Sequence, residues 1–227
     1  FIKNKTFEDV PELVGVLRRA WSELQPATIN RRMAILRRVC NLAYKEWRWI
    51  DTPVAGTVRP LRENNERHYY LTRAEVERLR MNCTVSGAGD LIVLAAFTGL
   101  RLGEILGIRP GDVRDHSLHL RKTKNGRPRV VPLHPRAEAI AAKLPLPDVT
   151  QAVLRKQFVN ARTEAGLEHI HFHDLRHTFA SWMIQTGTPL NVLKELMGHK
   201  TIQMTMRYAH LCADNLRAAI DRLPLDT

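Results

Sequence analysis

The sequence predicts a mostly helical α+β protein in two domains, the second of which carries a small antiparallel sheet. Three observations support this prediction. Apolar residues recur at helical spacing in the first fifty positions, and this periodicity disappears over residues 51–66, where prolines, a glycine and polar residues gather. Further on, two short alternating segments flank the turn signal Asn125-Gly126. We therefore expect an all-helical domain over residues 1–62 and an α+β domain over residues 63–227.

The clearest helix of the first domain begins at Pro26, which suits a first helical position because proline lacks the N–H that would be unbonded there. Its apolar stripe is formed by Ile29, Met33, Leu36, Cys40, Ala43 and Trp47. Basic residues recur every seven positions on the far side, at Arg31, Arg38 and Lys45. We interpret this basic face as a DNA-backbone contact, although a solvated charged face is the commoner explanation. A shorter helix over residues 10–24 can pack beside it.

The second domain begins with a helix whose start is encoded locally. Thr72 and Glu75 form a capping box, and Leu71 with Val76 form the matching hydrophobic staple. We expect a buried helix over residues 90–106, interrupted at Thr98-Gly99, and a hairpin of strands 117–121 and 129–133. Beyond Pro147 the chain reads as helical. Its predicted helices are 174–186, one that ends at Gly198, and 213–223.

The net charge is the unusual feature of the composition. The chain has 35 Lys and Arg residues against 23 Asp and Glu residues, a formal charge of +12. Such an excess favours a polyanionic partner, because each neutralised phosphate releases a condensed counterion. Residues 1–62 hold 12 basic and 6 acidic residues, so each predicted domain carries +6. A two-domain clamp on DNA would explain this even distribution, while a basic protein without a nucleic-acid role is the alternative.

The three cysteines, at positions 40, 83 and 212, show no CxxC spacing and suit reduced thiols in a cytoplasmic protein. The longest apolar run, over residues 91–97, is too short to span a bilayer, and no signal peptide is visible. We therefore expect no membrane association and a location in the bacterial cytoplasm or nucleoid. The chain begins with Phe1 rather than Met, so we expect the natural protein to extend further upstream.

Four motifs in the second domain carry groups suited to phosphate chemistry. In order they are Thr98-Gly99-Leu100-Arg101-Leu102-Gly103-Glu104, Lys124 in the hairpin, His173-Asp174-Leu175-Arg176-His177-Thr178, and Met197-Gly198-His199 followed nine residues later by Tyr208. Breaking a phosphodiester requires charge stabilisation, a nucleophile and a proton for the leaving oxygen. No acidic cluster has metal-ligand spacing, so planar guanidinium groups, which match phosphate bidentately, are the natural substitutes.

These motifs, in this order over about half of the chain, resemble those of the tyrosine recombinase, or phage integrase, family. Met197 stands where the family usually has Leu, which is a volume-conserving change. The resemblance implies a tyrosine recombinase catalytic domain preceded by a helical core-binding domain. It implies a site-specific recombinase that cuts and rejoins DNA through a 3′-phosphotyrosyl bond, without metal, cofactor or ATP. It assigns phosphate binding to Arg101, Arg176 and His199, proton acceptance to His173, proton donation to Lys124 and nucleophilic attack to Tyr208.

The residues themselves leave some of these assignments open. Glu104, three positions after Arg101, can orient that arginine or a neighbouring histidine, and a simple structural ion pair is an equal alternative. Lys122 lies two positions from Lys124 on the same strand face and can replace it as proton donor. We interpret His177, one helical turn after His173, as structural. The other tyrosines considered, at positions 44, 69 and 70, lack a preceding Gly-His pair.

The expected partners are double-stranded DNA and further copies of the chain, since the family acts as a tetramer on paired sites. Accessory DNA-bending proteins can assist, and the last helix can dock on its own domain or on a neighbour. Three alternatives compete with this reading. A type IB topoisomerase would use the same chemistry, a catalytically inactive chain would only bind DNA, and His169, His171 and His173 alternate in a way that suggests zinc but lack a fourth ligand.

Overall fold

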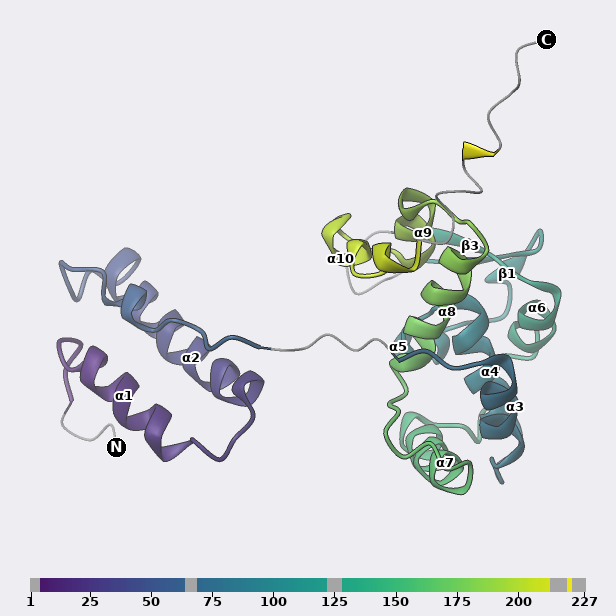
Figure 1. Cartoon of the computed structure of the whole chain (residues 1–227), viewed down its shortest axis with the longest axis horizontal. Helices are drawn as coiled ribbons and strands as arrows, with labels where there is room; N and C mark the ends of the chain where they lie inside the picture. The colour runs from purple at the N-terminus through teal and green to yellow at the C-terminus, as the bar shows by residue number, and fades with distance from the viewer. Residues whose placement is uncertain (1–4, 64–68, 122–127, 213–219, 222–227) are drawn as a thin grey trace, which may run out of the picture. The chain divides into compact units, whose positions relative to one another are not determined.

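The computed structural model describes residues 5–63, 69–121, 128–212 and 220–221. The chain divides into two compact units, Phe1–Arg67 and His68–Thr227 (Figure 1). The boundary expected from the sequence, between residues 62 and 63, lies inside the C-terminal segment of the first unit. Among the helices of the described residues, none combines the length and the apolar composition that a membrane-spanning helix needs.

The first unit is a pair of helices closed by a short 3₁₀ turn. Helix α1 (Val10–Ala20) and helix α2 (Pro26–Lys45) share one apolar cluster with η1 (Val54–Thr57). Helix α2 begins at Pro26 as predicted and buries four residues of the predicted stripe, namely Ile29, Met33, Cys40 and Ala43. The side chain of Asn30 accepts the Leu61 N–H and donates to the Leu61 carbonyl oxygen, which fastens the end of the unit to α2.

Two details of the first unit differ from the prediction. Helix α1 ends at Ala20 rather than at residue 24. Trp47 is not part of the α2 stripe, because the helix ends at Lys45 and the chain turns through Arg48, whose φ of 56° is left-handed. Trp47 is consequently 42% exposed, and its ring lies 4.6 Å from that of Trp49.

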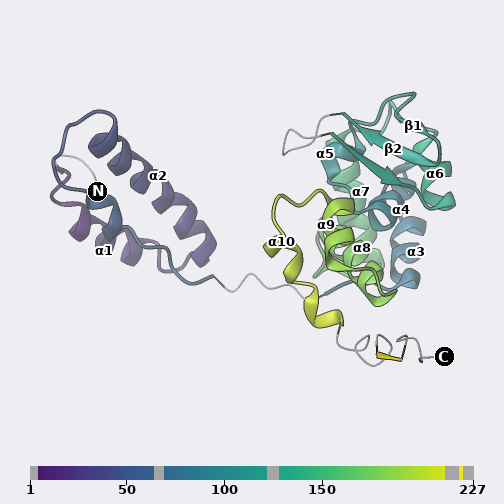
Figure 2. The same cartoon turned by 90° about the horizontal axis from the view of Figure 1, so that it is seen from above.

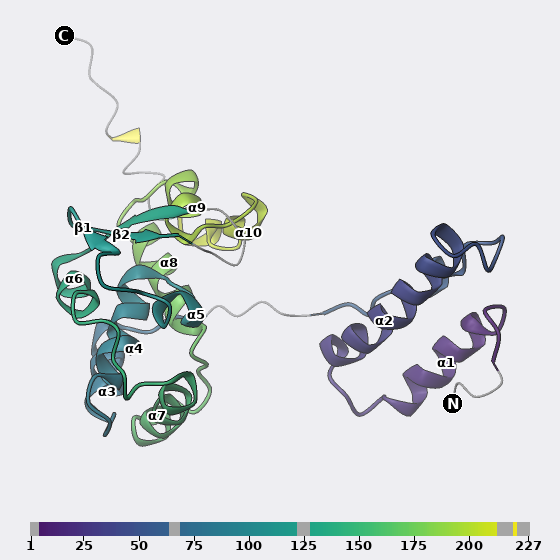
Figure 3. The ribbon, with the colours of Figure 1, turned by 180° about the vertical axis from the view of Figure 1, so that it is seen from behind.

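The second unit is built around α4 (Ala88–Thr98), which is apolar on nearly all its faces and therefore must be buried. Four helices surround α4, namely α3 (Arg73–Met81), α6 (Pro135–Ala141), α7 (Gln151–Glu164) and α8 (Asp174–Gln185) (Figure 3). The predicted capping box of α3 is present, because the Thr72 hydroxyl accepts the Glu75 N–H and the Glu75 carboxylate accepts the Thr72 N–H. The predicted break at Thr98-Gly99 separates α4 from the short α5 (Leu102–Ile105).

The sheet has three antiparallel strands in the order β1-β2-β3, where β1 is Val113–Arg114, β2 is Ser117–Leu120 and β3 is Arg129–Pro132. The predicted hairpin is confirmed, with Leu118 opposite Val131; its turn at Asn125-Gly126 lies outside the described residues. Strand β1 was not predicted. It is joined to β2 by Asp115 and His116, whose φ values of 50° and 55° are those of a type I′ turn. The sheet and α7 lie at opposite ends of the unit (Figures 1 and 3).

The C-terminal part consists of α9 (Leu190–Met197), α10 (Gln203–Met206) and η2 (Ala209–Cys212), with α9 beside both α8 and α10 (Figure 2). As predicted, Gly198 ends α9, in a left-handed conformation with φ of 61°. Side chains from α8, α9 and the segment after α10 form a separate apolar cluster that includes Tyr208. The helix predicted over 213–223 falls almost entirely outside the described residues.

Candidate active site

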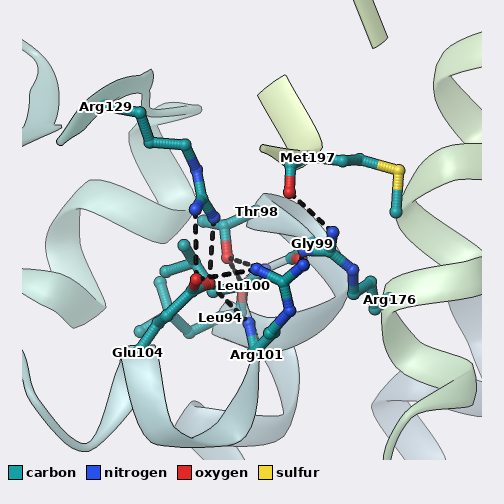
Figure 4. A network of polar contacts seen from close by, with 9 residues as sticks. All are labelled: Leu94, Thr98, Gly99, Leu100, Arg101, Glu104, Arg129, Arg176 and Met197. Atoms are coloured by element: carbon teal, nitrogen blue, oxygen red, sulfur yellow. Dashed lines mark hydrogen bonds and ion pairs between the residues drawn. The ribbon is translucent and has the colours of Figure 1, made fainter. Parts of the chain in front are cut away.

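The first arginine of the site is placed by a sharp turn between two helices. Gly99 ends α4 with φ of 63°, a left-handed conformation that favours glycine. A Cβ at this position would also lie 2.5 Å from the Phe179 ring, so the turn requires glycine for steric reasons as well. Two residues later Arg101 is the N-cap of α5 and leaves the buried part of the chain. Its guanidinium points toward that of Arg176, across the turn (Figure 4).

Glu104 connects Arg101 to an arginine that sequence reasoning had not included in the site. The Glu104 carboxylate accepts the Arg101 backbone N–H at 2.9 Å and Arg101 Nη1 at 3.0 Å. It also accepts Nη1 and Nη2 of Arg129 on β3, at 3.1 and 2.9 Å. Although burial acts to raise it, these hydrogen bonds from Arg129 and the Arg101 backbone lower the pKa of Glu104 below its ordinary value. Glu104 is therefore an ionised carboxylate shared by two arginines.

Arg176 is held deep in the unit by two backbone carbonyl groups. It lies on α8 and is only 3% exposed. Its Nη1 donates to the Gly99 carbonyl oxygen and its Nη2 to that of Met197 at 2.6 Å. Burial, together with the charge of Arg101, lowers the pKa of Arg176 to about 10, so it stays cationic at neutral pH. Both contacts are made to helix ends, so Arg176 joins the α4–α5 turn to the end of α9.

His199 follows the Gly198 turn and enters the same region. Its Nδ1 lies 2.9 Å from the hydroxyl oxygen of Thr205 on α10. Burial and the nearby guanidinium groups of Arg176 and Arg101 lower the pKa of His199 to about 4. The imidazole is consequently neutral at physiological pH, and in the tautomer whose Nδ1 accepts the Thr205 hydroxyl proton its Nε2 carries a hydrogen that can be donated.

Tyr208 is buried against α8, and its hydroxyl meets His177 rather than His173. The hydroxyl oxygen lies 2.6 Å from His177 Nδ1, and the tyrosine is 5% exposed. Burial raises the pKa of Tyr208 to about 12, against the opposing charges of Arg207 and Arg176. Burial and the neighbouring His173 lower the pKa of His177 to about 4, so His177 is a neutral imidazole that can accept the tyrosine proton.

His173 lies at the start of α8, as the spacing of the His-x-x-Arg motif predicts. Its ring stands edge to face with the ring of His177, with the centroids 5.2 Å apart. Desolvation by the surrounding protein and the charge of Arg176 lower the pKa of His173. The neutral ring of His177 thus lies between Tyr208, which it contacts through Nδ1, and the neutral ring of His173.

The structure brings together most of the site residues expected from the sequence, but not all of them. Five catalytic candidates lie close together with Glu104 in the second unit, namely Arg101, His173, Arg176, His199 and Tyr208. Lys124 and its alternative Lys122 lie outside the described residues. In the first unit the side chains of Arg31, Arg38 and Lys45 are exposed on α2, and Arg38 and Lys45 line a shallow groove with Arg37 and Asn41. Across the described ranges, no group of three or more His, Cys, Asp or Glu residues is arranged to hold a metal ion.

Sequence reasoning missed the contacts of Arg129 and His177. The sequence predicts Arg129 only as the first residue of a strand, and it favours a structural role for His177. The one local signal for Arg129 was a charge beside an apolar strand, and for His177 a second imidazole one turn from His173. Neither signal names a partner, because Glu104 and Tyr208 lie 25 and 31 residues away along the chain.

Comparison with known proteins places this geometry in a family. Residues 69–214 match the model of the phage integrase family. The chain is 31% identical over 228 residues to a shufflon-specific DNA recombinase of Escherichia coli, which covers 95% of this chain and 59% of that protein. Several curated relatives are longer, and this chain spans about six tenths of their length.

Solved structures agree with this result. The catalytic domain of bacteriophage HP1 integrase is 31% identical to this chain, with a TM-score of 0.57. The match covers 69% of this chain and 95% of that domain. The integrase of transposon Tn1549 in complex with transposon right end DNA is 22% identical and shares the fold, with a TM-score of 0.69 over 98% of this chain and 87% of that one. From its motifs, its fold and these matches, the chain belongs to the phage integrase family of tyrosine recombinases.

Proposed function

We propose that this chain is a site-specific DNA recombinase that cleaves and rejoins DNA strands through a 3′-phosphotyrosyl intermediate. The observation that carries this proposal is the convergence of two guanidinium groups, from Arg101 and Arg176, with His199 in the unit that also holds Tyr208. Such a set can bind and neutralise a phosphodiester beside a nucleophile. The longer relatives include proteins named as integrases and recombinases, which supports the same reaction.

The phosphate is held by groups that the fold arranges in advance. Arg176 is fixed by two carbonyl groups, and Arg101 is fixed by Glu104, so neither guanidinium must reorganise when charge develops on the non-bridging oxygens. The neutral His199 adds a hydrogen bond from Nε2. Together these donors can stabilise the pentacovalent transition state without a metal ion.

In the reaction the Tyr208 oxygen forms a bond to phosphorus, and the bond from phosphorus to the 5′ oxygen breaks. The phenolic proton needs an acceptor, because the pKa of Tyr208 is raised to about 12. The family resemblance assigns this role to His173, whereas the 2.6 Å contact favours His177. The two rings lie side by side, so variants of each residue are needed to assign the proton.

The departing 5′ oxygen takes a proton from Lys124, with Lys122 as the alternative donor. A 5′-hydroxyl from another strand then attacks phosphorus and gives its proton to the deprotonated lysine. The bond from phosphorus to the Tyr208 oxygen breaks, and that oxygen takes back the proton that the histidine had accepted. The phosphate remains activated in the covalent bond, so this second step requires no ATP.

Residues 1–62, which lie within the first unit, supply a core-binding domain that contacts the DNA backbone through Arg31, Arg38 and Lys45, while residues 63–227 carry the catalysis. Exposure of these three side chains on α2 and the +6 charge of residues 1–62 support this role. Strand exchange joins two duplexes, so we propose that four copies assemble on paired sites in the bacterial cytoplasm, aided by accessory DNA-bending proteins.

Covalent trapping on DNA tests the proposal. Nicked duplexes tiled across the genomic DNA that flanks the gene release a short strand on cleavage, which prevents religation and accumulates the adduct. We expect a detergent-resistant protein–DNA adduct whose linked peptide, identified by mass spectrometry, contains Tyr208. Adding a second duplex with a free 5′-hydroxyl then yields a joint strand. Binding of these duplexes without any adduct would show a DNA-binding module, and religation of only the original strand would show a topoisomerase.

A further inference from the structure

Arg129 lies next to the candidate active site and has no role in the reaction proposed above. We infer that Arg129 is a positioning residue, which locks the Glu104 carboxylate in place and thereby aims the Arg101 guanidinium at the scissile phosphate. This inference rests on the proposed function and adds a residue of β3 to the machinery that carries it out.

The hydrogen bonds to Glu104 differ between Arg129 and Arg101, and this difference indicates a different role for each arginine. Arg129 faces Glu104 as a fork, and each of its two Nη atoms donates to a different carboxylate oxygen (Figure 4). Arg101 donates only Nη1 to this carboxylate, which leaves its Nη2 and Nε for a ligand. The side chain of Arg129 is 11% exposed and that of Arg101 is 20% exposed. Both Nη atoms of Arg129 are therefore committed to Glu104, while Arg101 keeps two side-chain nitrogens that make no bond to this carboxylate.

Charge explains why a second arginine is needed. Glu104 is buried, and burial raises the pKa of a carboxylate. With Arg101 as its only charged partner, Glu104 would be protonated more easily than with both arginines. Once protonated, it would lose part of its attraction for Arg101, which also experiences repulsion from Arg176. The bidentate pair with Arg129 keeps Glu104 ionised, because hydrogen bonds from Arg129 oppose the effect of burial on the pKa of Glu104.

Arg129 also touches the segment that carries His199. A Cβ placed on Gly198 would lie 2.7 Å from Arg129 Nη1 and 2.9 Å from its Cζ, so the guanidinium packs directly on the turn after α9. One side chain from β3 therefore contacts both the Glu104 carboxylate and the residue before His199. Displacing it should therefore disturb two of the groups proposed to bind the phosphate, Arg101 through Glu104 and His199 through Gly198.

The test measures single-turnover cleavage of a nicked duplex at saturating protein between pH 6 and pH 9. Arg129→Met keeps the length of the side chain and removes the charge, and Arg129→Lys keeps the charge without the fork. We expect cleavage by Arg129→Met to fall about 10- to 100-fold, as when residues that orient a ligand-contacting group are removed. Arg129→Lys should be intermediate, and affinity for DNA should change little in either variant.

The pH profile separates positioning from a general structural role. In Arg129→Met the acid side of the profile should shift to higher pH than in the wild type, because Glu104 then protonates more easily. Adding Glu104→Gln should remove this shift, and the combined loss should be smaller than the product of the two single losses. Arg136→Met, which breaks the ion pair with Glu77 on other helices, is the matched control and should retain the wild-type profile.

Several outcomes would overturn the inference. Wild-type cleavage rates in Arg129→Met, or losses that multiply independently with those of Glu104→Gln, would show that Arg129 does not act through Glu104. A loss confined to DNA affinity would make Arg129 a direct DNA contact. Should Arg129→Met fail to fold by circular dichroism, Arg129→Lys and the double variant Arg129→Lys/Glu104→Gln give the same comparison. Absence of cleavage by the wild type itself would instead contradict the proposed function.

Discussion

Removing the hydroxyl group of Tyr208 should separate catalysis from DNA binding. In Tyr208→Phe the nucleophilic oxygen is absent, so we expect no covalent adduct on any nicked duplex. Affinity for DNA should change little, because a buried hydroxyl that contacts His177 contributes no charge to the DNA-binding surface. The same substitution also removes a buried hydrogen bond, so it should have a measurable cost in stability.

The size of that cost follows from the contact. The hydrogen bond is 2.6 Å long and buried, and its loss leaves His177 Nδ1 without the tyrosine as its partner. An unsatisfied buried polar group costs about 1–3 kcal/mol. For a unit of this size each kcal/mol lowers Tm by about 2–4 °C. We therefore expect Tyr208→Phe to lower the Tm of the second unit by about 2–12 °C.

Thermal unfolding and denaturing gels of the trapping reaction measure the two effects on one preparation. Tyr70→Phe is the matched control, since the Tyr70 hydroxyl accepts Gln185 Nε2 at 2.8 Å in an exposed position. It should form adducts at the wild-type rate and unfold within about 1 °C of the wild type, because surface changes are usually within about 0.5 kcal/mol. Adducts that persist in Tyr208→Phe would move the nucleophile elsewhere. An unchanged Tm would refute the buried contact with His177.

Three further predictions follow from the same site. Adduct formation should survive excess EDTA, because arginines supply the positive charge; a strict divalent-ion requirement would contradict the mechanism. Lys124→Ala should slow cleavage of normal DNA but be rescued by a 5′-bridging phosphorothioate, whose thiolate leaves without a proton, whereas Arg101→Ala and Arg176→Ala should not be rescued. Rescue of Lys122→Ala instead would reassign the proton donor. Lastly, His177 and His199 have pKa values lowered to about 4 from an ordinary 6.5, so the unfolded chain binds more protons below pH 6.5. Stability is fully present above that pH and should fall as the pH drops toward 4, by at most about 1.4 kcal/mol per pH unit for each histidine. Denaturant unfolding should show this fall, and a flat stability from pH 6.5 to pH 4.5 would disprove it.

The local structure of this chain was predictable where its cause lies within a few residues. The cap at Thr72, the helix ends at Gly99 and Gly198 and the apolar helix α4 all appear as predicted. Trp47 shows the limit of the method. Its spacing continues the α2 stripe, but the chain turns at Arg48, which has a left-handed backbone conformation. The spacing of apolar residues does not predict such a turn.

The sequence by itself determined which side chains are the candidates for the chemistry, because the order and spacing of the motifs single out Arg101, His173, Arg176, His199 and Tyr208. Only the tertiary structure decided what each of them touches. The fold brings Arg129 on β3 to Glu104 on α5, and the segment after α10 returns to α8 and brings Tyr208 to His177. These contacts depend on packing between elements far apart in the chain. Periodicity reports which face of a helix or strand is buried, but not which distant side chain it is buried against.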